Sequence, residues 1–178
     1  MFTSVLRLFP QARPEPFPGN GDLILTRTLH VPRGRVFRAW TDPRQLARWW
    51  GPKDFTNPVC ALDPRPGGAL SILMRAPDGA EHPMAGVYRE VEEPEDLVFV
   101  STAFEDAAGY PRLEVLNTVV FTEQDGATAL TLTARILQAA PELAAAVAGM
   151  AQGWSQSLDR LQRLLYRGPG PGAHSASF

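Results

Sequence analysis

The chain has 178 residues, of which 44% are hydrophobic and 20% charged, values typical of a globular protein. A formal net charge of −2 gives no electrostatic basis for binding nucleic acid or an anionic membrane surface. Cys60 is the single cysteine, which excludes an internal disulfide. No segment resembles a signal peptide or has the length of a membrane span. We therefore expect a cytoplasmic protein.

The two ends of the chain differ in composition from its middle. Residues 1–20 include Pro10, Pro14, Pro16 and Pro18 and show little periodicity, which predicts an extended, proline-rich N-terminal arm. Residues 168–178 carry too little apolar surface to fold and predict a disordered tail. Residues 21–167 are then expected to form one domain, long enough to bury a core.

The domain is predicted to begin with a strand and two short helices. Residues 23–30 have the apolar and β-branched content of a strand, and a short helical pattern follows through Val36, Phe37 and Trp40.

The second short helix has clear boundary signals and is predicted over residues 43–49. Asp42 suits the N-cap and Pro43 the first helical position, while Gly51 ends the turn. Gln45 stands where a capping-box partner would reach back to the backbone of Asp42.

From residue 55 the apolar period changes from helical to two, which predicts a series of strands. Gly-rich and Asp-Gly turns separate most of them, so the neighbours are expected to pair as hairpins. The strands are predicted at 55–62, 70–75, 84–91, 97–103, 113–122 and 128–137.

The last two predicted strands each have one strongly apolar face. We expect these faces to meet a helix. The residues concerned are Leu113, Val115, Asn117, Val119 and Phe121 in the first strand, and Leu130, Leu132, Ala134 and Ile136 in the second.

A long helix is predicted over residues 141–166. Its large apolar residues recur every three or four positions and form one stripe, and Pro141 and Glu142 suit a helix start. Together with the strands, this predicts an α+β fold in which helices lie on one side of an antiparallel sheet. A single long helix held in the curve of such a sheet leaves a space that is either filled core or a ligand cavity.

Several segments together resemble a known family. They are FRAWTDPRQLARWWGP, PGGALSILMRAPDG, HPMAGVYREVEEPEDLVF, DGATALTLTARI and GMAQGWSQSLDRLQRLL, which cover about residues 22–166 in order. On these segments the chain resembles a bacterial member of the activator-of-heat-shock-protein-90-ATPase-like family, which belongs to the START-like, or SRPBCC, superfamily.

The resemblance implies the helix-grip fold, a curved antiparallel sheet of about six to seven strands around a long C-terminal helix. In many superfamily members the cavity in between holds a lipid, sterol, polyketide or other apolar ligand. The eukaryotic protein of the family stimulates a chaperone ATPase and uses a separate N-terminal domain to dock. Residues 1–20 are too short for such a domain, so the resemblance gives little support to a chaperone partner.

The tryptophan pair Trp49 and Trp50 ends the second short helix. Because the two residues are adjacent, we expect only one to face the core and the other to rim the cavity entrance. Trp154 is expected to pack in the core or to form part of the cavity wall.

Polar residues on apolar strand faces are further candidates for ligand contact, because a buried amide or phenol needs a partner. Asn117 and Tyr88 are of this kind, although a neighbouring side chain or a water could also serve. Methionines adapt to irregular ligands and irregular cores alike. The complete set of cavity candidates is Trp49, Trp50, Phe55, Met74, Met84, Tyr88, Phe99, Asn117, Phe121, Val147, Met150 and Trp154.

Catalytic and metal-binding patterns are not evident in the sequence. His30, His82 and His174 are scattered, and no nucleophile, metalloprotease or phosphate-loop motif is found. We therefore name no catalytic residue, metal or cofactor. The helix-plus-sheet pattern and the resemblance, together with this lack of catalytic clusters, lead us to expect a protein that binds a small hydrophobic or amphipathic ligand between residues 141–166 and the sheet. The alternatives are a protein-interaction module, as a chaperone cofactor or a homodimer, and a cavity enzyme of the cyclase or dehydratase type.

Overall fold

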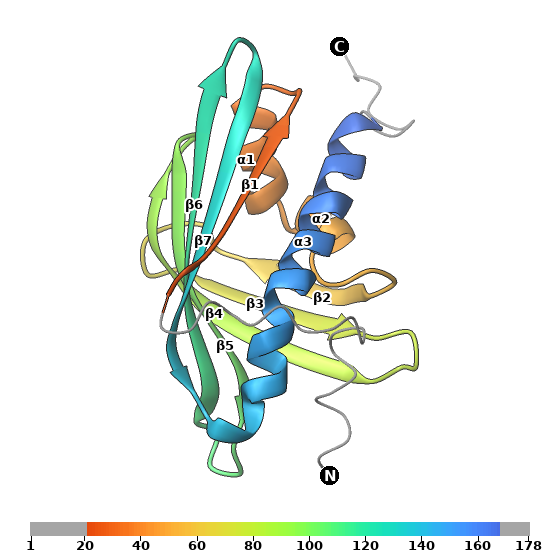
Figure 1. Ribbon diagram of the computed structural model, residues 1–178, viewed down its shortest axis with the longest axis vertical. Coiled ribbons are helices and arrows are strands. Elements are labelled where there is room, and N and C mark those ends of the chain that lie inside the picture. The colour runs from red at the N-terminus through yellow and green to blue at the C-terminus, as the bar shows by residue number, and fades with distance from the viewer. Residues whose placement is uncertain (1–20, 168–178) are drawn as a thin grey trace, which may run out of the picture.

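The computed structural model describes residues 21–167, which form a curved seven-stranded sheet and a long helix across one of its faces (Figure 1). The expected N-terminal arm and C-terminal tail lie outside the described residues. The elements are β1 (Leu23–Leu29), α1 (Arg33–Thr41), α2 (Pro43–Trp49), β2 (Thr56–Leu62), β3 (Ala69–Arg75), β4 (Glu81–Glu92), β5 (Asp96–Glu105), β6 (Pro111–Gln124), β7 (Ala127–Ala139), η2 (Pro141–Leu143) and α3 (Ala144–Tyr166).

The sheet is antiparallel throughout, with the order β1-β7-β6-β5-β4-β3-β2. Strands β2 to β7 follow one another as hairpins, and β1 pairs with β7 at the far edge. Helices α1 and α2 pack against α3, so all helices share one side of the sheet. The α+β helix-grip fold is confirmed.

The inner face of the sheet follows the predicted alternation. Val119 pairs with Leu132 and Asn117 with Ala134 across β6 and β7, and all four side chains are buried. Because strand side chains alternate between faces, the residues between them point to the other side. Both predicted apolar faces therefore lie toward α3.

The long helix begins later than its apolar stripe suggests. Pro141 to Leu143 form a 3-10 turn, and the α-helix starts at Ala144 without a side-chain cap at Leu143. Short 3-10 turns are frequent at helix N-termini. Met150, Leu158, Leu161 and Leu165 of the stripe are buried, as predicted for the face that packs on the sheet.

Asp42 joins the two short helices. Its backbone N–H closes α1 on Arg38 O, while its carboxylate accepts from Arg44 N at the start of α2. The N-cap role predicted for Asp42 is thus confirmed. The capping box is not: Gln45 Nε2 donates to the Asp42 side chain (3.3 Å), because the backbone N–H that it would have bound is already used.

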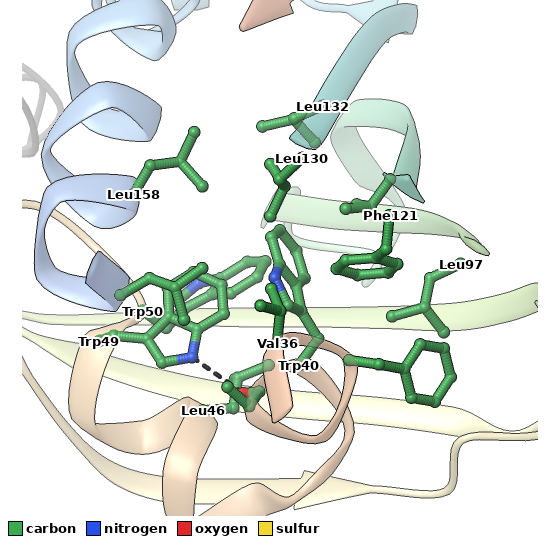
Figure 2. Close-up of a cluster of buried hydrophobic side chains, with 14 of the residues drawn as sticks. Val36, Trp40, Leu46, Trp49, Trp50, Leu97, Phe121, Leu130, Leu132 and Leu158 are labelled. Atoms are coloured by element: carbon green, nitrogen blue, oxygen red, sulfur yellow. Dashed lines mark hydrogen bonds between the residues drawn. The ribbon is translucent and has the colours of Figure 1, made fainter. Parts of the chain in front are cut away.

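All four tryptophans of the chain form one group, which we call the tryptophan cluster: Trp40, Trp49, Trp50 and Trp154 (Figure 2 shows the first three). Trp49 and Trp50 lie 4.7 and 6.3 Å from Trp40 between ring centroids. Trp154 stacks on Trp40 and meets Trp50 edge-on at 5.0 Å.

The expectation that only one of Trp49 and Trp50 faces the core is wrong, since they are 0% and 6% exposed. Helix α2 ends at Trp49, and Trp50 adopts an extended backbone (φ −63°, ψ 139°). The change of direction turns both indoles inward. Trp49 Nε1 donates to Ala39 O (2.9 Å), which satisfies the one polar group of that side chain (Figure 2).

The sheet-facing stripe of α3 predicts a strong, position-dependent effect of leucine truncation. Leu161 is 0% exposed, so L161A should lower the free energy of unfolding by about 2–5 kcal/mol. The matched control is L137A, because Leu137 on β7 is 50% exposed and should cost less than about 1 kcal/mol. Urea unfolding followed by circular dichroism measures both. Equal losses would show that α3 does not anchor the core.

Candidate functional site

A cavity of about 120 Å³, partly open to solvent, lies between the sheet and α3. Its wall combines the segment after α2, four neighbouring strands and the middle of α3. The lining residues are Trp50, Gly51, Pro52, Met74, Met84, Ser101, Thr102, Ala103, Phe104, Leu113, Val115, Asn117, Met150, Gly153, Trp154 and Ser157.

The structure brings half of the predicted site residues to this cavity. Met74 on β3, Met84 on β4 and Met150 on α3 converge from three elements, although methionine would serve equally well as core filling. The other three predicted residues that line the cavity are Trp50, Asn117 and Trp154.

The remaining candidates lie elsewhere in the core. Tyr88 and Phe99 border a much smaller space, of about 10 Å³, beside Trp40. Trp49 and Phe121 are buried in the main core. Phe55 belongs to a small cluster with Ala76. Val147 packs against the cluster that contains Leu23 and Leu113.

Several lining residues were not anticipated from the sequence. Ser101 and Ala103 continue the alternation of Leu97 and Phe99 along β5, so strict period-two counting would have placed them on the inner face. Phe104 gives no such signal. Its φ of 58° lies in the left-handed region, which is rare for a bulky residue and re-aims its side chain at the end of the strand.

Asn117 is the polar centre of the site and is 1% exposed. Its Nδ2 donates to Ser101 Oγ (2.9 Å) and Val115 O (3.1 Å), with Phe99 O at 3.5 Å. The two backbone carbonyls accept only, so they require the NH2 group on this side. The Asn117 Oδ1 atom is left buried with no hydrogen-bond partner among the described residues.

Two titratable groups, the buried Tyr88 and the half-buried Cys60, lie away from the cavity and are held protonated. Burial raises the pKa of the Tyr88 phenol, and the nearby Cys60 and Asp63 add to the shift. Burial, with a smaller contribution from Asp42, raises the pKa of the Cys60 thiol to about 11. A thiol that stays protonated at neutral pH is a poor nucleophile.

Arg160 holds the segment after α2 against α3. Its guanidinium donates to the backbone carbonyls of Arg48, Trp50, Gly51, Pro52 and Phe55 at 2.9–3.2 Å. Burial lowers its pKa, and Asp54 partly opposes the shift. We call this set of five bonds the Arg160 clamp. It positions Trp50, Gly51 and Pro52, which form one wall of the cavity.

Gly51 suits this wall for a conformational reason. Its φ of +91° belongs to the left-handed region, which a residue with a side chain rarely adopts. A Cβ at this position would also lie 3.3 Å from Met74 Sδ, inside the cavity wall.

Residues 21–167 contain neither a metal-binding cluster nor a helix that could span a membrane. No group of three or more His, Cys, Asp or Glu side chains there could hold a metal ion. None of the helices in this range has the length and apolarity to cross a membrane.

The Arg160 clamp predicts a specific loss of stability. R160M keeps the hydrocarbon of the side chain but removes the donors, so we expect a loss of roughly 2–3 kcal/mol. Arg163 lies one turn further on and is exposed, so R163M is the matched control and should change stability by less than about 0.5 kcal/mol. Chemical unfolding compares the two variants. A clamp without structural importance would give equal, small effects.

His82 predicts a pH dependence. It faces Phe55 with 6.2 Å between ring centroids, and its Nε2 is buried with no partner among the described residues. Burial lowers its pKa, while Asp78 acts in the opposite direction.

Because the unfolded chain takes up the His82 proton at a higher pH than the folded protein, stability should fall as pH drops below the ordinary histidine pKa of about 6.5. The variant H82Q should lose less stability than the wild type over this range. Thermal unfolding at a series of pH values measures the difference, with H30Q, at an exposed histidine, as the control. Parallel curves for wild type and H82Q would contradict the assignment.

Solved structures with the same architecture come from several bacteria. Protein Ms6760 from Mycobacterium smegmatis is 27% identical, with a TM-score of 0.69 over 90% of this chain and 94% of that chain. The AHSA1 protein from Silicibacter pomeroyi is 26% identical, with a TM-score of 0.70 over 83% and 99%. Protein NE0264 from Nitrosomonas europaea is 27% identical, with a TM-score of 0.67 over 82% and 94%.

The family comparison agrees with these likenesses and with the resemblance seen in the sequence. No curated protein matches the chain significantly. The family model described as "Activator of Hsp90 ATPase homolog 1-like protein" matches residues 30–166, which is most of the chain and includes every element that lines the cavity. The chain therefore belongs to the activator of Hsp90 ATPase homologue 1-like family.

Proposed function

We propose that this chain is a cytoplasmic protein that binds a small apolar or amphipathic molecule in the cavity between the sheet and α3. The observation that carries the proposal is an apolar cavity bordered by a buried amide oxygen without a partner, that of Asn117. Ligand sites combine these two features, a mostly apolar wall and a few polar groups that fix orientation.

The energetic cost of the cavity supports this function. Cavity formation costs about 24 cal/mol per Å³, so a fully enclosed space of 120 Å³ would cost about 3 kcal/mol, and this partly open cavity costs less than that. An unsatisfied buried acceptor adds about 1–3 kcal/mol. A small domain is stable by only about 5–15 kcal/mol in total, and a bound ligand would offset both costs.

The chemistry of the wall favours binding over catalysis. Among the described residues that line the cavity, none is an Asp, Glu, Lys, Arg or His. Tyr88 and His82, which lie on β4 together with the lining residue Met84, do not line it. The wall thus offers hydrogen bonds and apolar contact but no general acid or base. Catalysis in the cavity, formation of a homodimer and binding to a chaperone remain predictions.

Filling the cavity should abolish binding. A103L adds a branched hydrocarbon to a lining position on β5, and we expect ligand affinity to fall at least tenfold because the occupied volume excludes the ligand. The matched control is A85L on β4, where the side chain is exposed on the other face of the sheet and affinity should be unchanged.

Native mass spectrometry of freshly purified protein, followed by denaturation and identification of released molecules, measures the outcome. The wild type and A85L should carry an additional mass that A103L lacks. The same spectra count protomers and so test the homodimer. The proposal would be contradicted if the wild-type protein carried no bound mass and its tryptophan fluorescence did not change when neutral apolar probes were added.

A further inference from the structure

The wall of the cavity restricts the charge of its ligand. The described residues that line it are apolar, or are neutral polar residues such as Ser101, Asn117 and Ser157. An ionised ligand group would lose its hydration and find no opposite charge, at a cost far above that of a neutral polar group. The ligand is therefore expected to be neutral.

The size and lining of the cavity suggest an aromatic body. An engineered cavity of about 150 Å³ in another protein binds benzene, and the present volume of about 120 Å³ is close to it. Trp50, Phe104 and Trp154 offer ring faces and edges, and the three methionine side chains make favourable contacts with aromatic rings. One six-membered ring fits this space.

One end of the ligand should carry a hydroxyl group. Asn117 Oδ1 needs a donor, because its own NH2 group is turned to Ser101, Val115 and Phe99. Ser101 Oγ accepts from Asn117 and keeps its own O–H to donate. A hydroxyl can donate to the first group and accept from the second at the same time, which an ether, a ketone or a hydrocarbon cannot do.

The Asn117 oxygen is covered in this conformation and must turn slightly to meet a ligand. The terminal torsion of asparagine is broad, so a modest rotation has a low cost. The first bond to weaken would be the longest one, to Phe99 O at 3.5 Å.

We infer that the cavity selects a small neutral aromatic alcohol of the phenol class, whose hydroxyl donates to Asn117 Oδ1 and accepts from Ser101 Oγ. The inference rests on the proposed function, since it specifies the ligand of that same cavity. Affinity comes from the aromatic and methionine wall, and selection for the hydroxyl comes from the Asn117–Ser101 pair.

The test compares phenol with toluene, which has nearly the same shape but carries a methyl group in place of the hydroxyl. Titrations monitored by tryptophan fluorescence report on the cavity, because Trp50 and Trp154 line it. In N117L the ratio of the toluene Kd to the phenol Kd should fall by about tenfold relative to the wild type, since the hydroxyl loses its acceptor.

S101A provides a milder variant in case N117L does not fold, and the ratio should fall in the same direction. S71A, at an exposed serine on β3, is its matched control and should retain the wild-type ratio. Binding of toluene to the wild type with a ratio that neither variant changes would overturn the inference and leave the proposed function intact. Failure of the wild type to bind either probe would overturn the inference, while native mass spectrometry separately decides the proposed function.

Discussion

One guanidinium group, that of Arg160, holds the segment after α2 against α3. Helix C-termini leave backbone carbonyls without intrahelical partners and carry the negative end of the helix dipole. Arg160 reaches this end of α2 from α3 and binds Arg48 O together with four carbonyls of the next seven residues. The positive charge of Arg160 is thus stabilised mainly by the dipoles of backbone carbonyl groups, since no carboxylate of the described residues hydrogen-bonds to it. The same hydrogen bonds hold the backbone of Trp50 in the position that places its indole in the tryptophan cluster.

The cavity exists because small residues face one another where α3 crosses the sheet. Gly153 and Ser157 on the helix and Ser101 and Ala103 on β5 all line the cavity. On the C-terminal side of this point leucines such as Leu158 and Leu161 fill the core, and on the other side Leu143 and Ala146 do so. The space is therefore local: the fold packs its core tightly at both ends of α3 and leaves the middle open.

Sequence periodicity predicts which face of a strand is buried more reliably than where along that face a residue lies. Asn117 was placed correctly on the inner face by alternation alone. Tyr88 and Phe99 also lie on the inner face, yet they border the small space beside Trp40, because position along a curved sheet depends on register, and β4 carries a bulge between Tyr88 and Glu90.

The positions of the other lining residues depend on backbone geometry at the ends of helices and strands, which sequence periodicity does not predict. The inward turn of Trp50 depends on its extended conformation after α2, and the position of Phe104 depends on a positive φ. The five carbonyls bound by Arg160 could not have been foreseen either, since they come from a segment more than a hundred residues away in the chain. Such contacts follow from tertiary packing, which local patterns specify only in part.

Stability and selectivity are linked at Asn117. A buried acceptor without a partner lowers the stability of the fold, and under the proposed function the same atom would disfavour any ligand that cannot supply a donor. Purely apolar walls discriminate weakly between molecules of similar shape, by only about 1–3 kcal/mol per methylene group. With no charged residue among the described lining side chains, discrimination in this cavity must come from hydrogen bonds. If the cavity binds a ligand as proposed, a molecule that satisfies Asn117 would both stabilise the fold and be distinguished from its hydrocarbon analogues.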